Sequence, residues 1–243
     1  MITHHQFART WGIPNLSVFC VKVETYLRMN KLPHKIAETL PLKGPRGKLP
    51  YIEDDGRKLS DSRLILNYLR ATYGDSDQEF LSPEQKSIAT AYQRLLEEHL
   101  YWVDMITRWN YTEENWQIIK QAIFGGLPPI ARDLAATIYR VKIKSQIKGH
   151  GIGRLTYEEI FELGKEDIDS LAKFLGNKPY FMGKQPSTLD ASAYGVLVNI
   201  LGSPFKSPLK THALTKQNLI DYCERVQTGY FPELPWVAVK DGS

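Results

Sequence analysis

The sequence predicts an α/β domain at the amino terminus and an all-helical domain after it. Up to residue 73, short strand-like runs alternate with stretches of helical periodicity, whereas beyond residue 82 the apolar residues recur only at helical spacing. A polar stretch separates the two patterns. We therefore expect domains at residues 1–73 and 82–243, joined by a linker at residues 74–81. A chain of 243 residues is long enough for both domains to bury a core.

The amino-terminal domain is expected to have the element order of a thioredoxin-like fold. The Asp55-Gly56 pair marks a hairpin turn, because both residues tolerate a positive φ. In chain order we expect a strand at residues 2–9, a helix that begins at Ser17, a strand at residues 34–40, a hairpin of two strands at residues 49–53 and 57–60, and a helix from Ser62 to Tyr73.

The second domain is predicted to consist of helices. Three of them begin with a capping box, in which a Ser or Thr at the cap pairs with a Gln, Glu or Asp three residues later; these boxes start at Ser82, Thr156 and Ser187. The expected helices lie at residues 84–109, from 112 onward, and at 130–148, 156–175, 191–201 and 217–226. The apolar run at residues 191–201 predicts a buried helix.

One stretch of the first domain combines the features of a small-ligand pocket. Pro50 opens the hairpin, and its missing N–H leaves neighbouring backbone groups free for a ligand. The hairpin ends in Asp61-Ser62 at the start of a helix, where unpaired N–H groups favour an anionic guest. The hairpin and the helix start together therefore predict a ligand site.

This stretch resembles the glutathione site of the glutathione transferase family. The resemblance implies that Pro50 is cis and that the backbone of Leu49 binds the cysteinyl part of glutathione. It also implies that Asp61 and Ser62 hold the γ-glutamyl end. The family usually has Gln or Glu where this chain has Asp61 and Lys48. Lys48 is expected to pair with a glutathione carboxylate, or else to be a solvated surface lysine.

Ser17 stands where thioredoxin-fold proteins keep the first residue of a Cys-x-x-Cys motif. It matches the catalytic Ser or Cys of tau-like and omega-like transferases, so the resemblance implies that its hydroxyl stabilises the thiolate of bound glutathione. Alternatively, Ser17 only caps the helix. Cys20 shares a helical face with Val23 and Leu27, so we expect it and Cys223 in the core. An exposed Cys20 would instead allow a mixed disulfide.

Aromatic residues lie on both sides of the predicted site. Trp11 lies beside the loop before Ser17, and Tyr101, Trp102 and Trp109 lie on the long helix that should pack against it. We consider Trp11 and Trp102 as contacts for an apolar electrophile. The alternative is that these aromatic side chains form the core between the domains.

The whole chain resembles one branch of that superfamily, the failed-axon-connections type, which is related to the metaxins. The matching stretches lie in both predicted domains, at residues 19–28, 97–102, 124–128, 151–154 and 178–183. The resemblance implies the two-domain glutathione transferase fold. It implies less about activity, because this branch contains proteins that are not enzymes.

The composition excludes several classes of function. The net charge is only +4 and the positive residues are dispersed, which disfavours a nucleic-acid binder. We interpret the densest basic cluster, at residues 140–148, as a solvated helix face. No apolar run approaches the roughly 18 residues that cross a bilayer. The six histidines lack the spacing of metal ligands, so we expect no metal. With only two cysteines and no visible signal peptide, a cytoplasmic setting is expected.

The sequence therefore predicts a glutathione-dependent transferase that conjugates or reduces a small apolar electrophile, with glutathione as co-substrate. Two alternatives stay open. One is a non-catalytic interaction protein that keeps the transferase scaffold, as the metaxins do. The other is a thiol-disulfide oxidoreductase, which requires an exposed Cys20. A homodimer is what the family resemblance implies.

Overall fold

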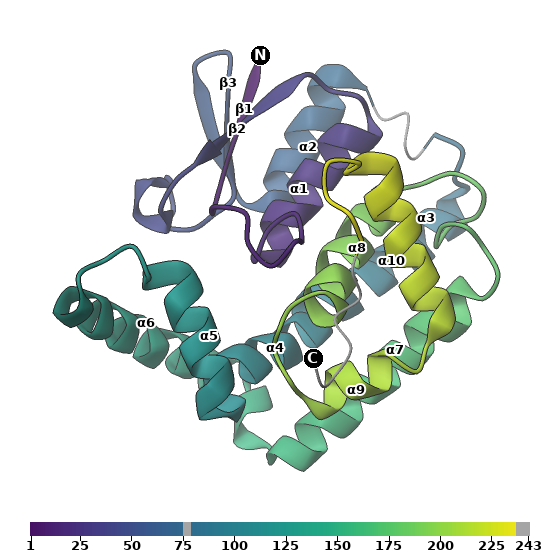
Figure 1. Cartoon of the computed structure of the whole chain (residues 1–243). Coiled ribbons are helices and arrows are strands. Elements are labelled where there is room, and N and C mark those ends of the chain that lie inside the picture. The colour runs from purple at the N-terminus through teal and green to yellow at the C-terminus, as the bar shows by residue number, and fades with distance from the viewer. Residues whose placement is uncertain (75–78, 237–243) are drawn as a thin grey trace.

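The computed structural model describes residues 1–74 and 79–236 and has the predicted two-part architecture (Figure 1). The amino-terminal part contains a four-stranded sheet of β1 (Ile2–Gln6), β2 (His34–Glu38), β3 (Tyr51–Asp54) and β4 (Arg57–Ser60), in the order β2-β1-β3-β4. Strands β1 and β2 are parallel, while β3 pairs antiparallel with β1 and with β4. The α/β prediction for this domain is confirmed. Residues 75–78 of the expected linker lie outside the described residues.

The hairpin forms where the sequence predicts it. Asp55 and Gly56 have φ angles of 47° and 74°, and Asp54 pairs directly with Arg57 across the two-residue turn. The first strand of the hairpin begins at Tyr51 rather than at residue 49. The reason is that Pro50 has no N–H for the ladder, so regular pairing starts after it.

Strand β1 buries polar side chains among apolar neighbours. His4 and Gln6 are fully buried on the same face as Ile2. Buried and partly exposed side chains therefore alternate regularly along the strand. The sequence does not show this alternation, because two of the buried positions hold a histidine and a glutamine. Burial lowers the pKa of His4 to about 3, so its imidazole is neutral at physiological pH. The strand ends at Gln6, three residues earlier than predicted.

Two helices of the first part cover the sheet: α1 (Val18–Met29) and α2 (Ser62–Tyr73). Val23, Tyr26 and Leu27 of α1 meet Ile52 of β3 and Ile65 of α2 in one apolar cluster. Helix α1 is buried along most of its length, because the sheet lies on one side of it and the helical domain on the other. It is therefore shared by both parts of the molecule.

The predicted long helix at residues 84–109 is present as a continuous helix that two π-helical stretches interrupt. It comprises α3 (Pro83–Arg94), η2 (Leu95–Leu100), α4 (Tyr101–Ile106) and η3 (Thr107–Tyr111), of which η2 and η3 are π-helical. The extra residue per turn rotates the helix faces, an irregularity that often occurs at functional sites. Apolar periodicity does not reveal it.

The remaining helices are α5 (Glu113–Phe124), α6 (Pro129–His150), α7 (Tyr157–Leu175), α8 (Thr188–Leu201), α9 (Pro208–Ala213) and α10 (Gln217–Tyr230). Short 3₁₀ turns are η1 (Pro41–Lys43) and η4 (Ile152–Arg154). The sequence did not predict α9, whose six residues are too few for a periodic pattern. Within the described ranges, no helix is long and apolar enough to cross a membrane.

All three predicted capping boxes are present. The reciprocal bonds join Ser82 with Gln85, Thr156 with Glu159, and Ser187 with Asp190. The last box is buried and more extensive. One Asp190 oxygen accepts from the Ser187 N–H and hydroxyl at 2.8 and 2.9 Å, and the other accepts from the Phe181 N–H at 2.8 Å. The box thus fixes the start of α8 and the loop before it.

Helix α8 lies against α1 at very short range. A Cβ added at Gly195 would lie 2.7 Å from the Val18 carbonyl oxygen, closer than real Cβ contacts. Only glycine permits this separation of the two backbones. The close approach sets the position of the start of α1 relative to the helical domain.

We predict that the buried capping box contributes more to stability than the exposed one. Ser187→Ala leaves the buried Asp190 carboxylate with fewer donors and should lower the free energy of unfolding by about 2–3 kcal/mol. Ser82→Ala removes an exposed cap and should cost about 1 kcal/mol. Urea denaturation of both variants measures the difference. Equal losses would show that burial adds nothing to this cap.

Candidate active site

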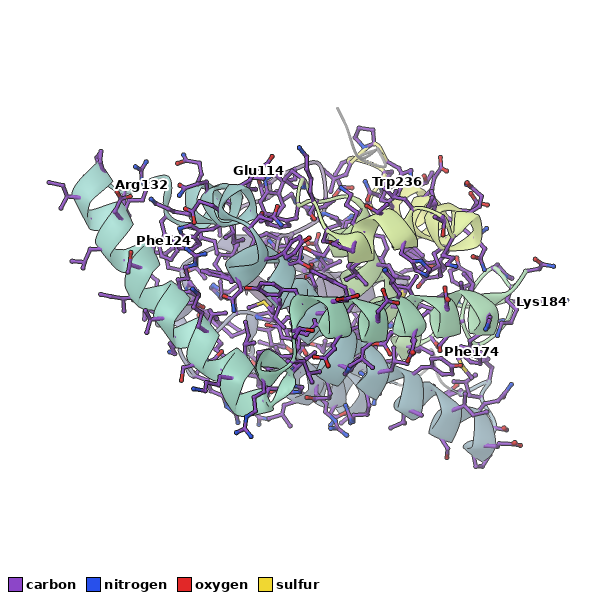
Figure 2. The ribbon with its side chains drawn as sticks, turned by 90° about the horizontal axis from the view of Figure 1, so that it is seen from below. Glu114, Phe124, Arg132, Phe174, Lys184 and Trp236 are labelled. Atoms are coloured by element: carbon purple, nitrogen blue, oxygen red, sulfur yellow. The ribbon has the colours of Figure 1, made fainter. Side chains whose placement is uncertain are left out.

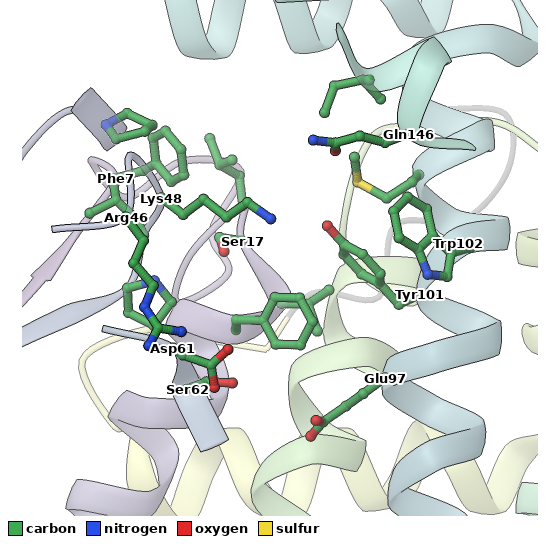
Figure 3. Close-up of a pocket in the computed structure, with 18 of the residues that line it drawn as sticks. Phe7, Ser17, Arg46, Lys48, Asp61, Ser62, Glu97, Tyr101, Trp102 and Gln146 are labelled. Atoms are coloured by element: carbon green, nitrogen blue, oxygen red, sulfur yellow. The ribbon is translucent and has the colours of Figure 1, made fainter. Parts of the chain in front are cut away.

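A cavity of about 450 Å³ lies between the α/β part and the helical part. Its volume is in the range of small-molecule sites. Figure 3 shows residues from both parts projecting into it. The cavity is lined by seven of the eight residues that the sequence singled out: Ser17, Lys48, Leu49, Pro50, Asp61, Ser62 and Trp102.

Trp11 is the exception. It does not line the cavity, and its ring instead meets Phe205 edge-on with the centroids 5.1 Å apart. Proximity in sequence to Ser17 was the reason to consider it as a substrate contact. The loop between the two residues turns Trp11 toward the helical core. The structure therefore favours the core interpretation for this tryptophan.

Asp61 and Ser62 form the start of α2 at the edge of the cavity. Asp61 is the N-cap residue: its Oδ1 accepts from the backbone N–H groups of Arg63 and Leu64 at 3.0 and 3.3 Å. Its φ angle of 79° is unusual for a residue with a side chain and costs of order 1–3 kcal/mol. This conformation directs the chain from β4 sharply into α2, so the helix terminus faces the cavity.

Ser62 is connected to a buried ion pair. Its Oγ accepts from the Lys22 ammonium at 3.4 Å, and Lys22 Nζ lies 2.6 Å from a carboxylate oxygen of Glu97. The same Glu97 oxygen accepts from Ser192 and Gln93 at 2.7 and 3.0 Å. Burial lowers the pKa of Lys22, while the Glu97 carboxylate opposes that shift. The sequence analysis missed this pair because 75 residues separate its members along the chain.

Ser17 caps a helix and also lines the cavity. It is the N-cap of α1, with its Oγ accepting from the Cys20 N–H at 3.4 Å, and it is only half-buried and lines the cavity. Two contacts hold its loop. The Ser17 N–H donates to Asn15 Oδ1 at 3.0 Å, and the Arg108 guanidinium donates to the Leu16 carbonyl at 2.6 Å. The hydroxyl is thus presented at a helix N-terminus, where negative charge is favoured.

Cys20 does not share this environment. Its side chain is fully buried, and burial raises its thiol pKa to about 12. Cys223 is also fully buried, and burial raises its pKa further. The prediction that both cysteines lie in the core is confirmed. The exposed Cys20 that a thiol-disulfide oxidoreductase requires is absent from this structure.

The hairpin end of the cavity is formed by residues 48–50. The Leu49–Pro50 peptide bond is cis, as the resemblance implied. Pairing between β1 and β3 reaches only as far as Tyr51, so the backbone groups of Leu49 lie outside the ladder. Lys48 is exposed at the rim and has no ion pair with any described residue. Its geometry is compatible with an anionic ligand and with a solvated lysine.

The opposite wall is apolar and aromatic. Tyr101, Trp102 and Met105 come from the long helical course, and Phe19 of α1 meets Tyr101 with ring centroids 4.9 Å apart. Burial raises the pKa of Tyr101 far above its usual range, so its phenol is neutral and able to donate a hydrogen bond. Trp109 lines the cavity and also packs on Trp116. Trp109 is therefore part of both the cavity wall and the core.

Helices α5 and α6 supply a part of the wall that the sequence analysis missed. Their inward residues at the cavity are Ile119, Ile123, Tyr139, Lys142, Ile143 and Gln146. These residues have the spacing of ordinary amphipathic helices, so nothing in the sequence marks them as functional. Only the packing of the α5–α6 hairpin on α4 and η3, at the side of the cavity, assigns them to it.

Four arginines at the cavity were also missed, Arg108 and three others. Arg46, Arg63 and Arg94 come from the loop before the hairpin, the first turn of α2 and the end of α3. Together with Lys48 they give this end of the cavity an excess of positive charge. Such an arrangement suits a ligand with carboxylates.

Two family models match the chain. The glutathione S-transferase N-terminal domain model matches residues 18–115, and the glutathione S-transferase C-terminal domain model matches residues 164–226. In a comparison of structures, a glutathione S-transferase of Methylobacterium radiotolerans, in complex with glutathione sulfonate, has a TM-score of 0.61 at 14% identity. It covers 99% of both chains.

Similar proteins of two kinds are found by sequence. An isoprene-epoxide glutathione S-transferase of Rhodococcus sp. (strain AD45) is 37% identical over 238 residues, which cover 95% of this chain and 99% of the relative. Failed axon connections of Drosophila melanogaster is 30% identical over 250 residues, 97% of this chain but 59% of that protein. Human metaxin-2 is 27% identical over 215 residues, 87% of this chain and 81% of the relative.

We predict that the Lys22–Glu97 pair is far more costly to break than to replace. Glu97→Gln leaves a buried ammonium without its counter-charge and should lower the free energy of unfolding by about 3–5 kcal/mol. The double variant Lys22→Met/Glu97→Leu removes both charges and should recover much of that loss. Urea denaturation of the single and double variants completes the cycle. Additive losses would contradict a direct coupling.

We also predict that neither cysteine reacts in the native protein. Because both thiols are buried and their pKa values are raised, a neutral disulfide reagent should find no reactive thiol until denaturant is added. After unfolding, both should react. Rapid labelling of Cys20 in the folded protein would restore the thiol-disulfide hypothesis.

Proposed function

The chain belongs to the glutathione transferase superfamily, and on that premise we propose that it joins the sulfur of glutathione to a small apolar epoxide. The observation that carries the proposal is the meeting of two helix N-termini at one cavity. Ser17 begins α1 there, Asp61-Ser62 begins α2, and an aromatic wall lies opposite. One end of the cavity suits an anionic peptide, and the other suits an apolar partner.

The first half of the proposal concerns glutathione. The Asp61 oxygen that does not cap α2 has no partner among the described residues and is suited to the γ-glutamyl ammonium. Ser62, with its hydroxyl and its backbone N–H at the start of α2, suits the γ-glutamyl carboxylate. Leu49 offers backbone groups to the cysteinyl part, and Lys48 offers its charge to the glycyl carboxylate. These assignments follow the resemblance residue by residue.

The second half concerns the sulfur. Near the start of α1 the helix dipole favours a thiolate, and the Ser17 hydroxyl donates a hydrogen bond to it. The thiol proton leaves to water. The thiolate then attacks a ring carbon of the epoxide, a carbon–sulfur bond forms and the carbon–oxygen bond breaks. The oxygen leaves as an alkoxide, which takes a proton from water. The product is a thioether with a neighbouring hydroxyl.

The choice of an epoxide is supported by the relative that is 37% identical, which is an isoprene-epoxide glutathione S-transferase. An aromatic and aliphatic wall accepts a small unsaturated hydrocarbon chain. Tyr101 is a neutral donor on that wall, so the cavity also offers a partner for the ring oxygen. Other small apolar electrophiles, including a peroxide that glutathione reduces, fit the same wall and belong in a screen.

A second candidate function is a non-catalytic scaffold. It is favoured by the similarity to failed axon connections and to metaxin-2. The two candidates differ in whether glutathione binds. The proposed homodimer is independent of both and is tested by sedimentation velocity at micromolar concentration.

We predict saturable binding of reduced glutathione in a calorimetric titration. Asp61→Ala removes both a contact for the γ-glutamyl end and the cap of α2, so it should weaken binding at least tenfold, or about 1.4 kcal/mol. Thr112→Ala removes a cap far from the glutathione end and serves as the control. Absence of binding to the wild-type protein at millimolar glutathione would instead favour the scaffold function.

We predict that Ser17→Ala retains glutathione binding but lowers the rate of conjugation with isoprene epoxide. The loss of one donor to the thiolate should reduce kcat by roughly 10²-fold and raise the pKa of the bound thiol. Ser17→Thr keeps the hydroxyl and the cap and should retain most of the activity. Activity that is unchanged in Ser17→Ala would remove Ser17 from the mechanism while leaving the glutathione site untouched.

A further inference from the structure

The outer face of α6 carries an apolar stripe that no described residue covers. Ile130, Leu134, Ile138 and Val141 are 87%, 63%, 62% and 63% exposed. Their spacing of four, four and three residues places them on one side of the helix over three turns. Figure 2 shows α6 along one edge of the molecule, with its side chains projecting outward. Ordinary surfaces scatter their apolar residues singly, whereas these are contiguous.

The inner face of the same helix is fully used. Ala136, Ile143 and Ile147 are buried in the helical core, and Tyr139 lines the cavity. The exposure of the stripe is therefore not the result of a poorly packed helix. It is a second apolar face on a helix that is already anchored.

Positive charge continues along the stripe toward the end of the helix. Lys144 and Lys148 are exposed and, by helical spacing, lie on the side of Ile130 and Val141. The acidic residue of α6 is Asp133, and Lys120 already lies 2.9 Å from it. Arg140 turns inward instead, with its guanidinium over Trp116 and its Nε donating to the Trp109 carbonyl. The predicted solvated face thus applies to Lys144 and Lys148 but not to Arg140, and Lys142 of the same cluster lines the cavity.

We propose that the outer face of α6 docks on an anionic lipid surface. A rigid helix with an apolar stripe and flanking lysines has the composition of an interfacial helix. The four apolar side chains enter the headgroup–acyl boundary, and Lys144 and Lys148 meet the anionic headgroups. No helix needs to cross the bilayer for this contact.

Charge distinguishes a lipid surface from a second copy of the chain. If two α6 helices met along their stripes, each would bring its lysines to a face whose acid is already paired. No described residue of α6 then supplies the counter-charge. An anionic membrane supplies it everywhere, whatever the orientation of the helix on it.

Docking would also serve the proposed function. Because the inner face of α6 lines the cavity and the outer face lies on lipid, one helix separates the acceptor site from the membrane. Small apolar electrophiles accumulate in lipid, so the site would be held close to its substrate. This consequence rests on the proposed function, whereas the lipid contact does not.

Co-sedimentation of the full chain with lipid vesicles tests the proposal. We expect binding to phosphatidylcholine vesicles that contain phosphatidylserine, weaker binding at high salt, and little binding to phosphatidylcholine alone. Ile130→Ser/Leu134→Ser/Ile138→Ser should reduce the partition coefficient at least about tenfold. Lys144→Glu/Lys148→Glu should reduce it about thirtyfold. Ile88→Ser, which alters an exposed apolar residue on α3, is the matched control and should bind as the wild type does.

The opposing outcomes are equally definite. The proposal is overturned if the wild-type protein ignores anionic vesicles at low salt, or if the triple variant binds as well as the control. Sedimentation velocity identifies the competing occupant: a dimer that the triple variant converts to monomer, without vesicle binding, assigns the stripe to a second copy. Glutathione titration of the triple variant shows that its cavity is intact and separates this result from any failure of the proposed function.

Discussion

The close packing of α1 on α8 is the constraint on which the rest of the structure depends. The two backbones approach so closely at Gly195 that no other residue fits there. Helix α1 carries Ser17 at its start and Lys22 in its middle, and the sheet holds its other side. A shift of α1 against α8 would therefore move the hydroxyl at the cavity and the buried ammonium together. The cavity has its shape because this contact leaves α1 no alternative position.

Buried charges also hold α1, and the loop before it, against the long helix of the helical domain. Lys22 meets Glu97, and Arg108 meets Asp104 at 2.6 Å while donating to Asn199 and to the Leu16 carbonyl. Removing such groups from water is costly, so these pairs add less net stability than their short distances suggest. Their effect is on specificity, because another docking of the two parts would leave Lys22 and Glu97 buried and unpaired and would separate Arg108 from the Leu16 carbonyl. Both networks end at the candidate site, one at Ser62 and the other at the loop of Ser17.

The α5–α6 hairpin gives the molecule a helix with two different apolar faces. One face closes the cavity with Tyr139 and Ile143, and the other displays Ile130 and Leu134. A helix that is apolar on both sides normally lies inside a protein. Here α5 and the helical core cover one side, so the second face is available to something outside the chain.

The sequence by itself determined the elements and the local chemistry of this protein. Residue-local rules located the hairpin at Asp55-Gly56, the capping boxes, the Leu49–Pro50 pair and the start of α2, because turn and cap preferences act over four residues or fewer. The position of Ser17 was likewise evident from the start of its helix. Burial of Cys20 followed from helical spacing alone.

The tertiary structure alone decided which of these residues share a site. The partnership of Lys22 with Glu97, the turn of Trp11 away from the cavity and the entry of Tyr139 and Gln146 into it all depend on how two domains dock. Docking is set by many weak contacts between residues far apart in the chain, and no local pattern encodes them. The sequence specified the chemical groups, and packing determined which of them meet.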